Sequence, residues 1–440
     1  MMRSEGSDCG AERRGALSKT VLARLVGAVL GGAALAMPAS LPALAETTIR
    51  LAHVETIPGA VKIWQQAARD FEQQHPGVKV EVNYLENEAY KAKLPTMLQS
   101  ADRPQIIYSW SGGVMRAQER AGYLQDVTAA AAPGLERFSG PAVRAFQIDG
   151  KTYGLPLQLS EVVFFYNKAL FAKAGVDAGK IRTWDDFLAA VKTLKAAGIT
   201  PIIVGGGEKW PMHFYWSYLM MRIGGAQALA DATAGKDGGF NNPVFVEAGK
   251  RLRELAALDP FQPGYLQTTH LQAAGLWGDG KGAIQLMGSW LLGTQANNAA
   301  DGKGLSKDNI GILSFPALAG GKGAPTDTLG GINGWLITKD APKEAFDFAA
   351  FLMSEPYQKQ AAAAGVYIPA LKGAEAWIED PLVKRMASDI AASTYHQIFL
   401  DQDLGPSVGR VVNDISVAVA AGEMTPEDAA AAIQQAWDEK

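Results

Sequence analysis

Cysteine is almost absent from this 440-residue sequence, because its single cysteine, Cys9, lies within the first 45 residues. The 395 residues that follow contain none. Cysteine nucleophiles, thiolate metal ligands and disulfides are therefore excluded for residues 46–440. A lipid anchor on a cysteine just after the first 45 residues is excluded for the same reason. A chain of this length can fold on its hydrophobic cores alone.

Charge is absent from one long stretch, residues 25–45. A basic segment, residues 13–24, precedes this run, and the small-residue triplet 43–45 (Ala-Leu-Ala) ends it. This order is typical of a cleaved secretory signal. The alternative is a membrane anchor, which two prolines and the small residues disfavour. The pattern predicts a signal peptide at residues 1–45 and a periplasmic location, and it leaves the Sec and twin-arginine export routes open.

An excess of basic residues is also absent. The formal net charge is −4, and it becomes −6 without the first 45 residues, which carry five basic and three acidic side chains. Binding to nucleic acid or to an anionic membrane depends on clustered positive charge. The composition therefore predicts no nucleic-acid partner.

Motifs of catalysis and of metal binding are missing too. The five histidines show no H-x-x-x-H or H-x-H spacing, so they predict no metal site. There is no G-x-S-x-G nucleophile elbow, and the glycines at 205–207 lack the rest of a phosphate-binding loop. Asp185 and Asp186 lie where a helix is expected to begin, and the helix dipole explains them. We expect no catalytic residue, no metal and no cofactor, and therefore no enzyme.

Strand-like and helix-like segments alternate along the chain. Residues 48–51, 78–84 and 106–108 read as strands, and residues 59–74 and 88–100 show helical spacing of apolar side chains. Strands separated by helices indicate a parallel sheet with helices on both faces. Because no low-complexity linker divides the chain, we expect an α/β protein whose lobes are joined by several chain crossings.

Two later helices have clear start signals. Thr183 precedes a helix that carries Asp186 at its third position, and a strand is expected next, at residues 201–204. Thr425 and the proline after it open a last helix that reaches Trp437.

Tryptophan occurs in an unusual setting. All ten tryptophans follow residue 45, and four of them, Trp110, Trp277, Trp290 and Trp335, have glycine or a small polar residue beside them. An indole at such a boundary is placed to face a cleft, although a single tryptophan is more often part of a core. The C–H face of a sugar ring stacks on an indole, while its hydroxyls bind polar side chains. The pattern favours a carbohydrate ligand.

Six motifs occur in one order along the chain: 153–156 (YGLP), 165–168 (FYNK), 183–187 (TWDDF), 282–290 (GAIQLMGSW), 330–333 (GGIN) and 345–352 (AFDFAAFL). Together they resemble family 1 of the extracellular solute-binding proteins, which includes the maltose-binding protein. The resemblance implies an α/β, two-lobed periplasmic-binding-protein fold of type II. Each lobe would be a mainly parallel sheet flanked by helices, and several hinge crossings would join the lobes.

The resemblance also implies boundaries and a function. Crossings are expected at 153–156, 315–316 and 368–369. The first lobe would comprise residues 46–156 and 317–367, and the second residues 157–315 and 370–440. The protein would be the monomeric periplasmic subunit of an ABC importer. It would capture a sugar, in particular an oligosaccharide, between closing lobes and deliver it to the permease in the inner membrane.

Five ligand-binding residues follow from matching positions in the family. Trp290 matches the sugar-stacking tryptophan of the second lobe, and Trp110 and Ser111 match contacts that follow the third strand. Trp210 matches a further aromatic contact. Glu55 lies where a polar contact is expected, although this sequence departs from the family pattern there.

Five further candidates come from residue type and position. Gly331 and Asn333 offer a backbone N–H and a side-chain amide, and Trp335 offers an indole beside glycine. Asp279 and Asp403 offer carboxylates to sugar hydroxyls, with a solvated loop charge as the alternative.

Other functions stay open from the sequence. Within the same fold, the ligand is alternatively a polyol, a glycerol phosphodiester, a polyamine or a metal. A secreted glycoside hydrolase also uses tryptophan platforms, but it needs two carboxylates across its cleft. A periplasmic chaperone is the third class. The sequence does not identify the sugar.

Overall fold

The computed structural model describes residues 46–440. The signal peptide predicted at residues 1–45 lies outside these residues. Within the described part of the chain, no helix is both long enough and apolar enough to cross a membrane.

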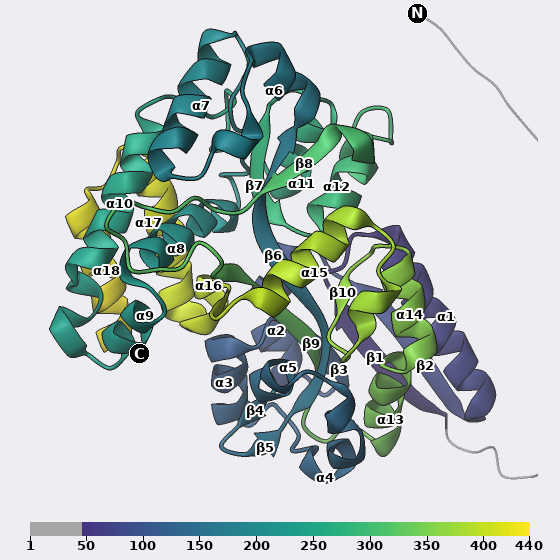
Figure 1. The fold of residues 1–440 in the computed structure, drawn as a ribbon. Coiled ribbons are helices and arrows are strands. Elements are labelled where there is room, and N and C mark those ends of the chain that lie inside the picture. The colour runs from purple at the N-terminus through teal and green to yellow at the C-terminus, as the bar shows by residue number, and fades with distance from the viewer. Residues whose placement is uncertain (1–45) are drawn as a thin grey trace, which may run out of the picture. The chain divides into compact units, whose positions relative to one another are not determined.

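A mixed sheet forms the centre of the first lobe (Figure 1). Its strands, in spatial order, are β10 (Ile368–Pro369), β6 (Gly154–Asn167), β9 (Thr328–Ile337), β3 (Ile106–Ser109), β1 (Thr47–His53) and β2 (Val78–Tyr84). β1 pairs in parallel with β2 and β3, whereas β9 runs antiparallel to β3 and β6. β11 (His396–Ile398) pairs in parallel with β9. The carboxyl ends of β1, β2 and β3 therefore lie at one edge of the sheet.

The long strand β6 continues into the second lobe. Its residues up to Glu161 pair with β9, and from Val162 onward they pair with β7 (Ile284–Gly288). β8 (Ile310–Leu313) lies on its other side in the second lobe. β6 runs antiparallel to β7, β8, β9 and β10. The sheets are for this reason mixed and not mainly parallel, because one 14-residue strand opposes its neighbours in both lobes.

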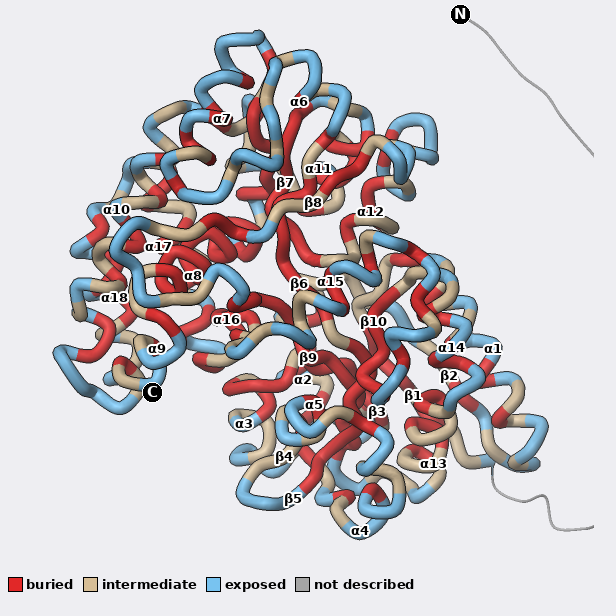
Figure 2. Tube along the Cα trace, in the orientation of Figure 1, coloured by how far each residue is buried: buried red, intermediate tan, exposed pale blue. Residues whose placement is uncertain are grey.

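The two-lobed α/β architecture expected from the sequence is confirmed. Two separate clusters of buried apolar side chains lie on either side of the point where β6 changes partner, one containing Leu157 and the other Val162. Figure 2 shows buried backbone in both lobes, for example along β3 in the first and β7 in the second. The changeover lies beyond residue 156, where the sequence places the lobe boundary. The expected crossing at 368–369 is strand β10, and Phe315 of the other expected crossing is buried in the second cluster.

Helices cover both sheets (Figure 1). Those that follow the first-lobe strands are α1 (Pro58–Gln74), α2 (Asn87–Gln99), α3 (Gly112–Arg120), α4 (Thr128–Ala131), α5 (Gly140–Ala145), α13 (Lys343–Leu352) and α14 (Glu355–Ala363). The remaining α-helices are α6 (Lys168–Ala174), α7 (Trp184–Ala196), α8 (Trp210–Gly224), α9 (Gln227–Thr233), α10 (Pro243–Ala256), α11 (His270–Gly278), α12 (Leu291–Asn298), α15 (Pro381–Ala392), α16 (Leu400–Asp403), α17 (Pro406–Ala421) and α18 (Pro426–Asp438). The short hairpin strands β4 (Gln147–Ile148) and β5 (Lys151–Thr152) pair with each other.

Local sequence signals explain where several helices begin. The hydroxyl of Thr183 accepts from the N–H of Asp186, whose carboxylate accepts from the N–H of Thr183, which completes a capping box at α7. Thr425 caps α18 in the same way from its side chain. The strand expected at 201–204 is wrong, because only Ile202 forms bridges there, one to Phe261 and one to Ile284.

Candidate functional site

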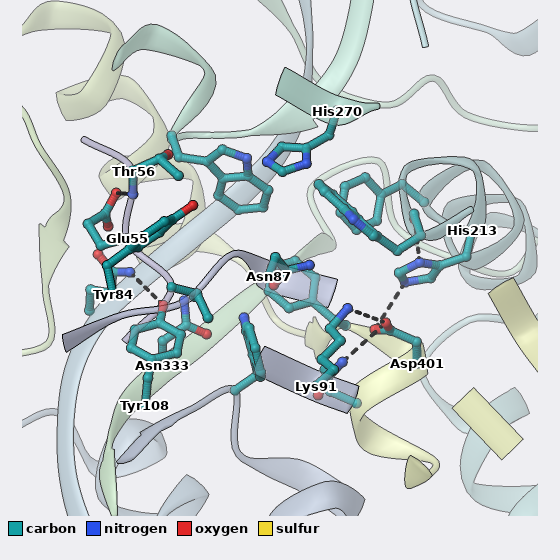
Figure 3. A pocket seen from close by; sticks show the side chains of 18 residues that line it. Glu55, Thr56, Tyr84, Asn87, Lys91, Tyr108, His213, His270, Asn333 and Asp401 are labelled. Carbon is teal, nitrogen blue, oxygen red and sulfur yellow. Dashed lines mark hydrogen bonds and ion pairs between the residues drawn. The ribbon is translucent and has the colours of Figure 1, made fainter. Parts of the chain in front are cut away.

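A cavity of about 110 Å³ lies between two walls that come from distant parts of the chain (Figure 3). Its lining residues are Val54, Glu55, Thr56, Tyr84, Asn87, Lys91, Tyr108, Trp110, Gln158, Trp210, His213, Phe214, His270, Trp290, Asn333, Phe399, Asp401 and Gln402. Those up to Gln158, together with Asn333, come from elements of the first lobe. The others come from α8, α11, α16 and the loops beside α12 and β11.

The first wall is built on the carboxyl edge of the parallel strands. Glu55 follows β1, Tyr84 ends β2 and Trp110 follows β3. Because parallel strands end at one edge, residues far apart in the sequence meet there, and open α/β sheets bind ligands at this edge. Gln158 of β6 and Asn333 of β9 complete the wall between the lobes.

The second wall is mainly one face of α8. Trp210, His213 and Phe214 are three and four residues apart, so they lie on the same side of the helix. The ring of Phe214 packs edge-on against Trp290, at 6.5 Å between centroids. Phe399 contacts both rings, at 5.6 Å from Phe214 and 5.9 Å from Trp290. The wall is thus a continuous aromatic surface.

Gly288 explains how Trp290 reaches the cavity. The indole folds back over the end of β7, where a Cβ at position 288 would lie 1.9 Å from a ring carbon of Trp290. No side chain larger than hydrogen fits there while the ring keeps its place. The glycine beside this tryptophan is therefore a steric requirement for the ring's position.

Trp110 faces the aromatic wall from the first lobe. Its ring packs edge-on against Tyr108 at 5.3 Å and Tyr90 at 5.9 Å. The ammonium of Lys91 lies 5.6 Å from the ring centre. The ring is half-buried, so packing fixes its edge while part of its surface lines the cavity. Indoles from both lobes thus line one space.

The Glu55 carboxyl lies at the start of α1. Its Oε1 accepts from the N–H groups of Thr56 at 2.9 Å and Ile57 at 2.8 Å. Burial raises the pKa of Glu55 to about 7, although these two hydrogen bonds act to lower it. Near neutral pH this carboxyl is therefore divided between its charged and neutral forms.

His213 and Asp401 present two hydrogen-bond acceptors to the same space (Figure 3). Nδ1 of His213 lies 2.6 Å from the carbonyl oxygen of Trp210, which only accepts, so Nδ1 carries the hydrogen. Burial lowers the pKa of His213, so the ring is neutral and Nε2 is an acceptor. This Nε2 has no hydrogen-bond partner among residues 46–440 and lies 3.7 Å from Oδ1 of Asp401. A hydroxyl donor from a ligand would satisfy it.

Two more buried polar atoms of the cavity residues lack a partner within the described chain: the side-chain oxygen of Asn333 and the indole N–H of Trp210. One is an acceptor and the other a donor. Buried polar groups are normally hydrogen-bonded, so these atoms are suited to a ligand that both donates and accepts.

Charged pairs border the cavity. Lys91 of α2 lies 3.9 Å from Oδ2 of Asp401, which joins the two walls, and 3.0 Å from Glu88. On the second wall, Oε2 of Glu208 accepts from the backbone N–H of His270 at 2.6 Å and lies 2.7 Å from its Nδ1. Burial acts to raise the pKa of Glu208, but His270 outweighs it and holds that pKa below its usual value.

Five of the ten residues that the sequence proposes as ligand contacts meet at the cavity: Glu55, Trp110, Trp210, Trp290 and Asn333. They come from five separate elements or loops in both lobes. Whether they bind a ligand stays a prediction.

Trp335, Ser111 and Gly331 lie outside the cavity lining. Trp335 is fully buried in the first-lobe core, with its ring 5.0 Å from that of Trp64, so β9 turns this indole away from the cleft. Ser111 is buried and its hydroxyl donates to the Trp110 carbonyl oxygen at 2.6 Å. The N–H of Gly331 is already used, since it donates to the Ser160 hydroxyl at 2.9 Å.

The two remaining aspartates also have other partners. Asp279 follows α11 and accepts from the N–H of Ala300 at 2.8 Å. Asp403 accepts from Gln397 at 3.0 Å and pairs with Arg116 at 3.4 Å. Arg116 belongs to α3, so Asp403 links the lobes beside the cavity without lining it.

Sequence reasoning missed Lys91, His213, Phe399 and Asp401. The spacing of His213 three residues after Trp210 was a usable signal, because it places both on one helix face. Lys91 and Asp401 gave no such signal, since their pairing depends on a contact across more than 300 residues. Within residues 46–440, His, Asp and Glu form no group of three or more suited to hold a metal ion.

Comparisons with known proteins give a consistent result. Residues 57–359 match the profile described as bacterial extracellular solute-binding protein. An uncharacterized ABC transporter extracellular-binding protein of Pyrococcus horikoshii is 26% identical over 300 residues, covering 66% of this chain and 65% of that protein. The multiple sugar-binding protein of Streptococcus mutans is 25% identical over 264 residues, covering 58% of this chain and 59% of its own. The matched region thus spans less than two thirds of either relative.

Solved structures extend the similarity over more of the chain. A chitin oligosaccharide binding protein has a TM-score of 0.81 and 26% identity, and the alignment covers 90% of this chain and 98% of that one. A protein from work on xylan utilization by Caldanaerobius polysaccharolyticus has the same TM-score at 25% identity, over 88% and 99% of the two chains. A raffinose complex of RafE, at 20% identity over 89% and 99% of the chains and a TM-score of 0.69, shares the fold.

Proposed function

Because this chain belongs to the bacterial extracellular solute-binding protein family, we propose that it captures a sugar for an ABC importer. The sugar, in particular an oligosaccharide, would bind between the two lobes and pass to the permease in the inner membrane. The observation that carries the proposal is the cavity, where indoles from both lobes surround buried donors and acceptors that have no partner within residues 46–440. A sugar offers both an apolar C–H face and hydroxyls that donate and accept.

The two walls support capture by closure of the lobes. We place the lobe boundary within β6, after Glu161, so that the first lobe comprises residues 46–161 and 317–367 and the second comprises residues 162–315 and 370–440. Contacts such as Lys91 with Asp401 and Arg116 with Asp403 join the lobes beside the cavity. A ligand that contacts both walls binds the closed arrangement better and shifts the population toward it.

The relatives support a carbohydrate over the other ligand classes. They include the multiple sugar-binding protein of Streptococcus mutans and the chitin oligosaccharide binding protein. A polyol or a glycerol phosphodiester is the alternative within the fold, and one relative is a glycerol-3-phosphate-binding periplasmic protein of Yersinia enterocolitica. We further propose that the protein is a periplasmic monomer, and that it is not an enzyme.

Glycoside hydrolysis is the second candidate, and one observation favours it. Two carboxyl groups with opposed acidities, Glu55 and Asp401, line the cavity from different walls. Burial raises the pKa of Glu55 to about 7. Burial acts to raise the pKa of Asp401 too, but His213, then Lys91 and two side-chain amides, outweigh it and hold this pKa below its usual value. A pair of this kind can supply the acid and the base of a glycosidase.

Incubation with end-labelled oligosaccharides separates binding from hydrolysis. We expect saturable binding at one site per chain and complete recovery of uncut ligand after long incubation. Products that accumulate with time would show that the protein hydrolyses the oligosaccharide, and the binding function would then be wrong. If no carbohydrate or polyol binds, the ligand class is wrong.

A further inference from the structure

A second cavity, of about 650 Å³, lies on the other face of the crossing strand β6. Successive side chains of a strand point to opposite faces, so Gln158 and Glu161, three residues apart, lie on opposite sides of β6. Gln158 lines the sugar cavity and Glu161 lines the second one, which we name the rear cavity. Its other walls are α15, α8, the segment 178–183 before α7, and the loops on either side of Phe315 and Asp327.

Two buried ionisable side chains of the rear cavity are incompletely hydrogen-bonded. Glu161 and Arg222 are each only 1% exposed. Oε2 of Glu161 and one terminal nitrogen of Arg222, Nη1, have no partner within residues 46–440. The other nitrogens of Arg222 donate to the carbonyl oxygens of Phe315, Pro325 and Asp327, which fixes its orientation. Leaving such groups buried without partners is costly, so the cavity is built to receive something polar.

The remaining charges of the rear cavity leave an excess of donors. The Nε of Arg385 donates to both oxygens of Asp389 at 2.8 Å, which leaves the terminal nitrogens of this guanidinium for a ligand. Arg182, an exposed residue, makes no side-chain hydrogen bond in the described part of the chain. The carboxylate of Asp327 is already satisfied, by Thr394 and by the N–H of Ala324. Of the residues that the structure describes, three arginines thus line the rear cavity together with one carboxyl whose Oε2 has no donor, that of Glu161.

We propose that the rear cavity binds a small tetrahedral oxoanion, such as phosphate or sulfate or a ligand that carries such a group. Arg222 would donate from the buried end, and Arg182 and Arg385 from the entrance. Guanidinium groups are matched to this chemistry because their planar donors form charge-assisted hydrogen bonds to the oxygens of such anions.

The protonation of Glu161 agrees with an anion. Burial and the neighbouring Asp389 raise the pKa of Glu161 to about 9, while Arg385 and Arg222 act to lower it. At neutral pH the carboxyl is therefore neutral, and its O–H is a further donor. Asp327 also lines the cavity, but its oxygens already accept two hydrogen bonds.

Isothermal titration of the exported chain with sodium sulfate and, separately, with sodium phosphate tests the proposal, with sodium chloride holding the ionic strength constant. We expect saturable binding of at least one of the two anions. Arg182→Gln and Arg385→Gln are exposed changes that leave the cores intact, and each should weaken binding about tenfold, the loss of one charge-assisted hydrogen bond. The matched control is Arg251→Gln, which removes a partly exposed arginine of α10 that is similarly paired, with Glu247, and should leave anion binding unchanged.

Glu161→Gln tests the donor role, because its amide still donates but does not ionise. Sulfate does not titrate near pH 9. The affinity of the wild type for sulfate should weaken above about pH 9, whereas the affinity of Glu161→Gln should be the same below and above this pH. The proposal is overturned if neither anion binds saturably, if both arginine variants bind like the wild type, or if Glu161→Gln abolishes binding at neutral pH. Sugar binding is measured on the same samples, and its result tests the proposed function independently of the oxoanion proposal.

Discussion

The indole of Trp290 packs directly against the backbone of Gly288, which has no side chain. The ring lies where any side chain at 288 would be, and it meets Phe214 and Phe399 on its other sides. A ring held by packing from several directions loses little further freedom when a ligand stacks on it. Preorganisation of this kind favours binding, because less ordering remains to be done.

We predict that Trp290→Ala lowers sugar affinity at least tenfold while the protein remains folded. The ring is half-buried and its loss removes a wall of the cavity rather than the centre of a core. The matched variant is Trp335→Ala, because that indole is fully buried against Trp64 and Tyr108. It should destabilise the fold by about 3 to 5 kcal/mol. Titration calorimetry and urea unfolding of both variants measure the contrast, and equal losses of stability would contradict it.

The ionisation of Glu55 predicts that sugar affinity depends on pH. Because acceptors of the cavity have no partner in the described part of the chain, they call for hydroxyl donors, and we expect the bound sugar to donate also to the charged form of this carboxyl. Its pKa of about 7 in the free protein then falls on binding, and a proton is released. Sugar affinity should therefore rise as the pH increases through about 7 and level off above it.

Calorimetry in buffers of different ionisation enthalpy measures this proton release directly. Glu55→Gln keeps the size of the side chain and removes its titration, so both the released proton and the pH dependence should vanish. A wild-type affinity that is flat across this range would show that the sugar does not distinguish the two forms of Glu55.

At the scale of single elements, the capping box of α7 contributes stability independently of the ligand. The hydroxyl of Thr183 accepts from the N–H of Asp186 at 3.2 Å, an amide that has no partner within the helix. Thr183→Ala should therefore lower the free energy of unfolding by about 1 kcal/mol. Thr193→Ala in the same helix is the control, because its hydroxyl only donates back to the Ala189 carbonyl oxygen. Urea unfolding that shows equal effects for both would contradict the role of the cap.

Elements with strong local signals were predictable from the sequence. Helical spacing and capping residues gave α1, α7 and α18 nearly to the residue, since each rests on interactions within a few positions. The strand expected at 201–204 failed for the opposite reason. An apolar run looks the same whether it forms a ladder or only the bridges that Ile202 makes to Phe261 and Ile284. Strand pairing depends on distant partners that the segment does not encode.

For the whole molecule, the sequence predicted two lobes but not the course of the crossing strand. No local sequence pattern predicts the residue at which a strand leaves one sheet and joins the next, as β6 does after Glu161. The candidate site shows the same limit. The aromatic positions were recognisable by residue type. Nothing in the sequence distinguishes Lys91 and Asp401 from ordinary surface charges, and only the fold brings their helices together.

Ligand binding should stabilise the whole chain measurably. A sugar at about 100 times its Kd adds about 2.7 kcal/mol to the free energy of unfolding. With an unfolding entropy of about 2.1 cal/mol/K per residue, a chain of this size should melt about 3 °C higher. A thermal-shift series over mono-, di- and trisaccharides measures it. A shift that is equally large in Trp290→Ala would place the binding elsewhere.

The two faces of β6 have one more consequence. Gln158 and Glu161 belong to the same short span of backbone, yet each borders a different cavity. If the position of that span differs between open and closed lobes, occupants of the two cavities share one conformational equilibrium. Thermodynamic reciprocity then requires equal cross-effects: whatever factor an oxoanion applies to the affinity for sugar, the sugar applies to the affinity for the oxoanion. The ionic composition outside the cell membrane would in this way set the threshold sugar concentration at which the importer is supplied.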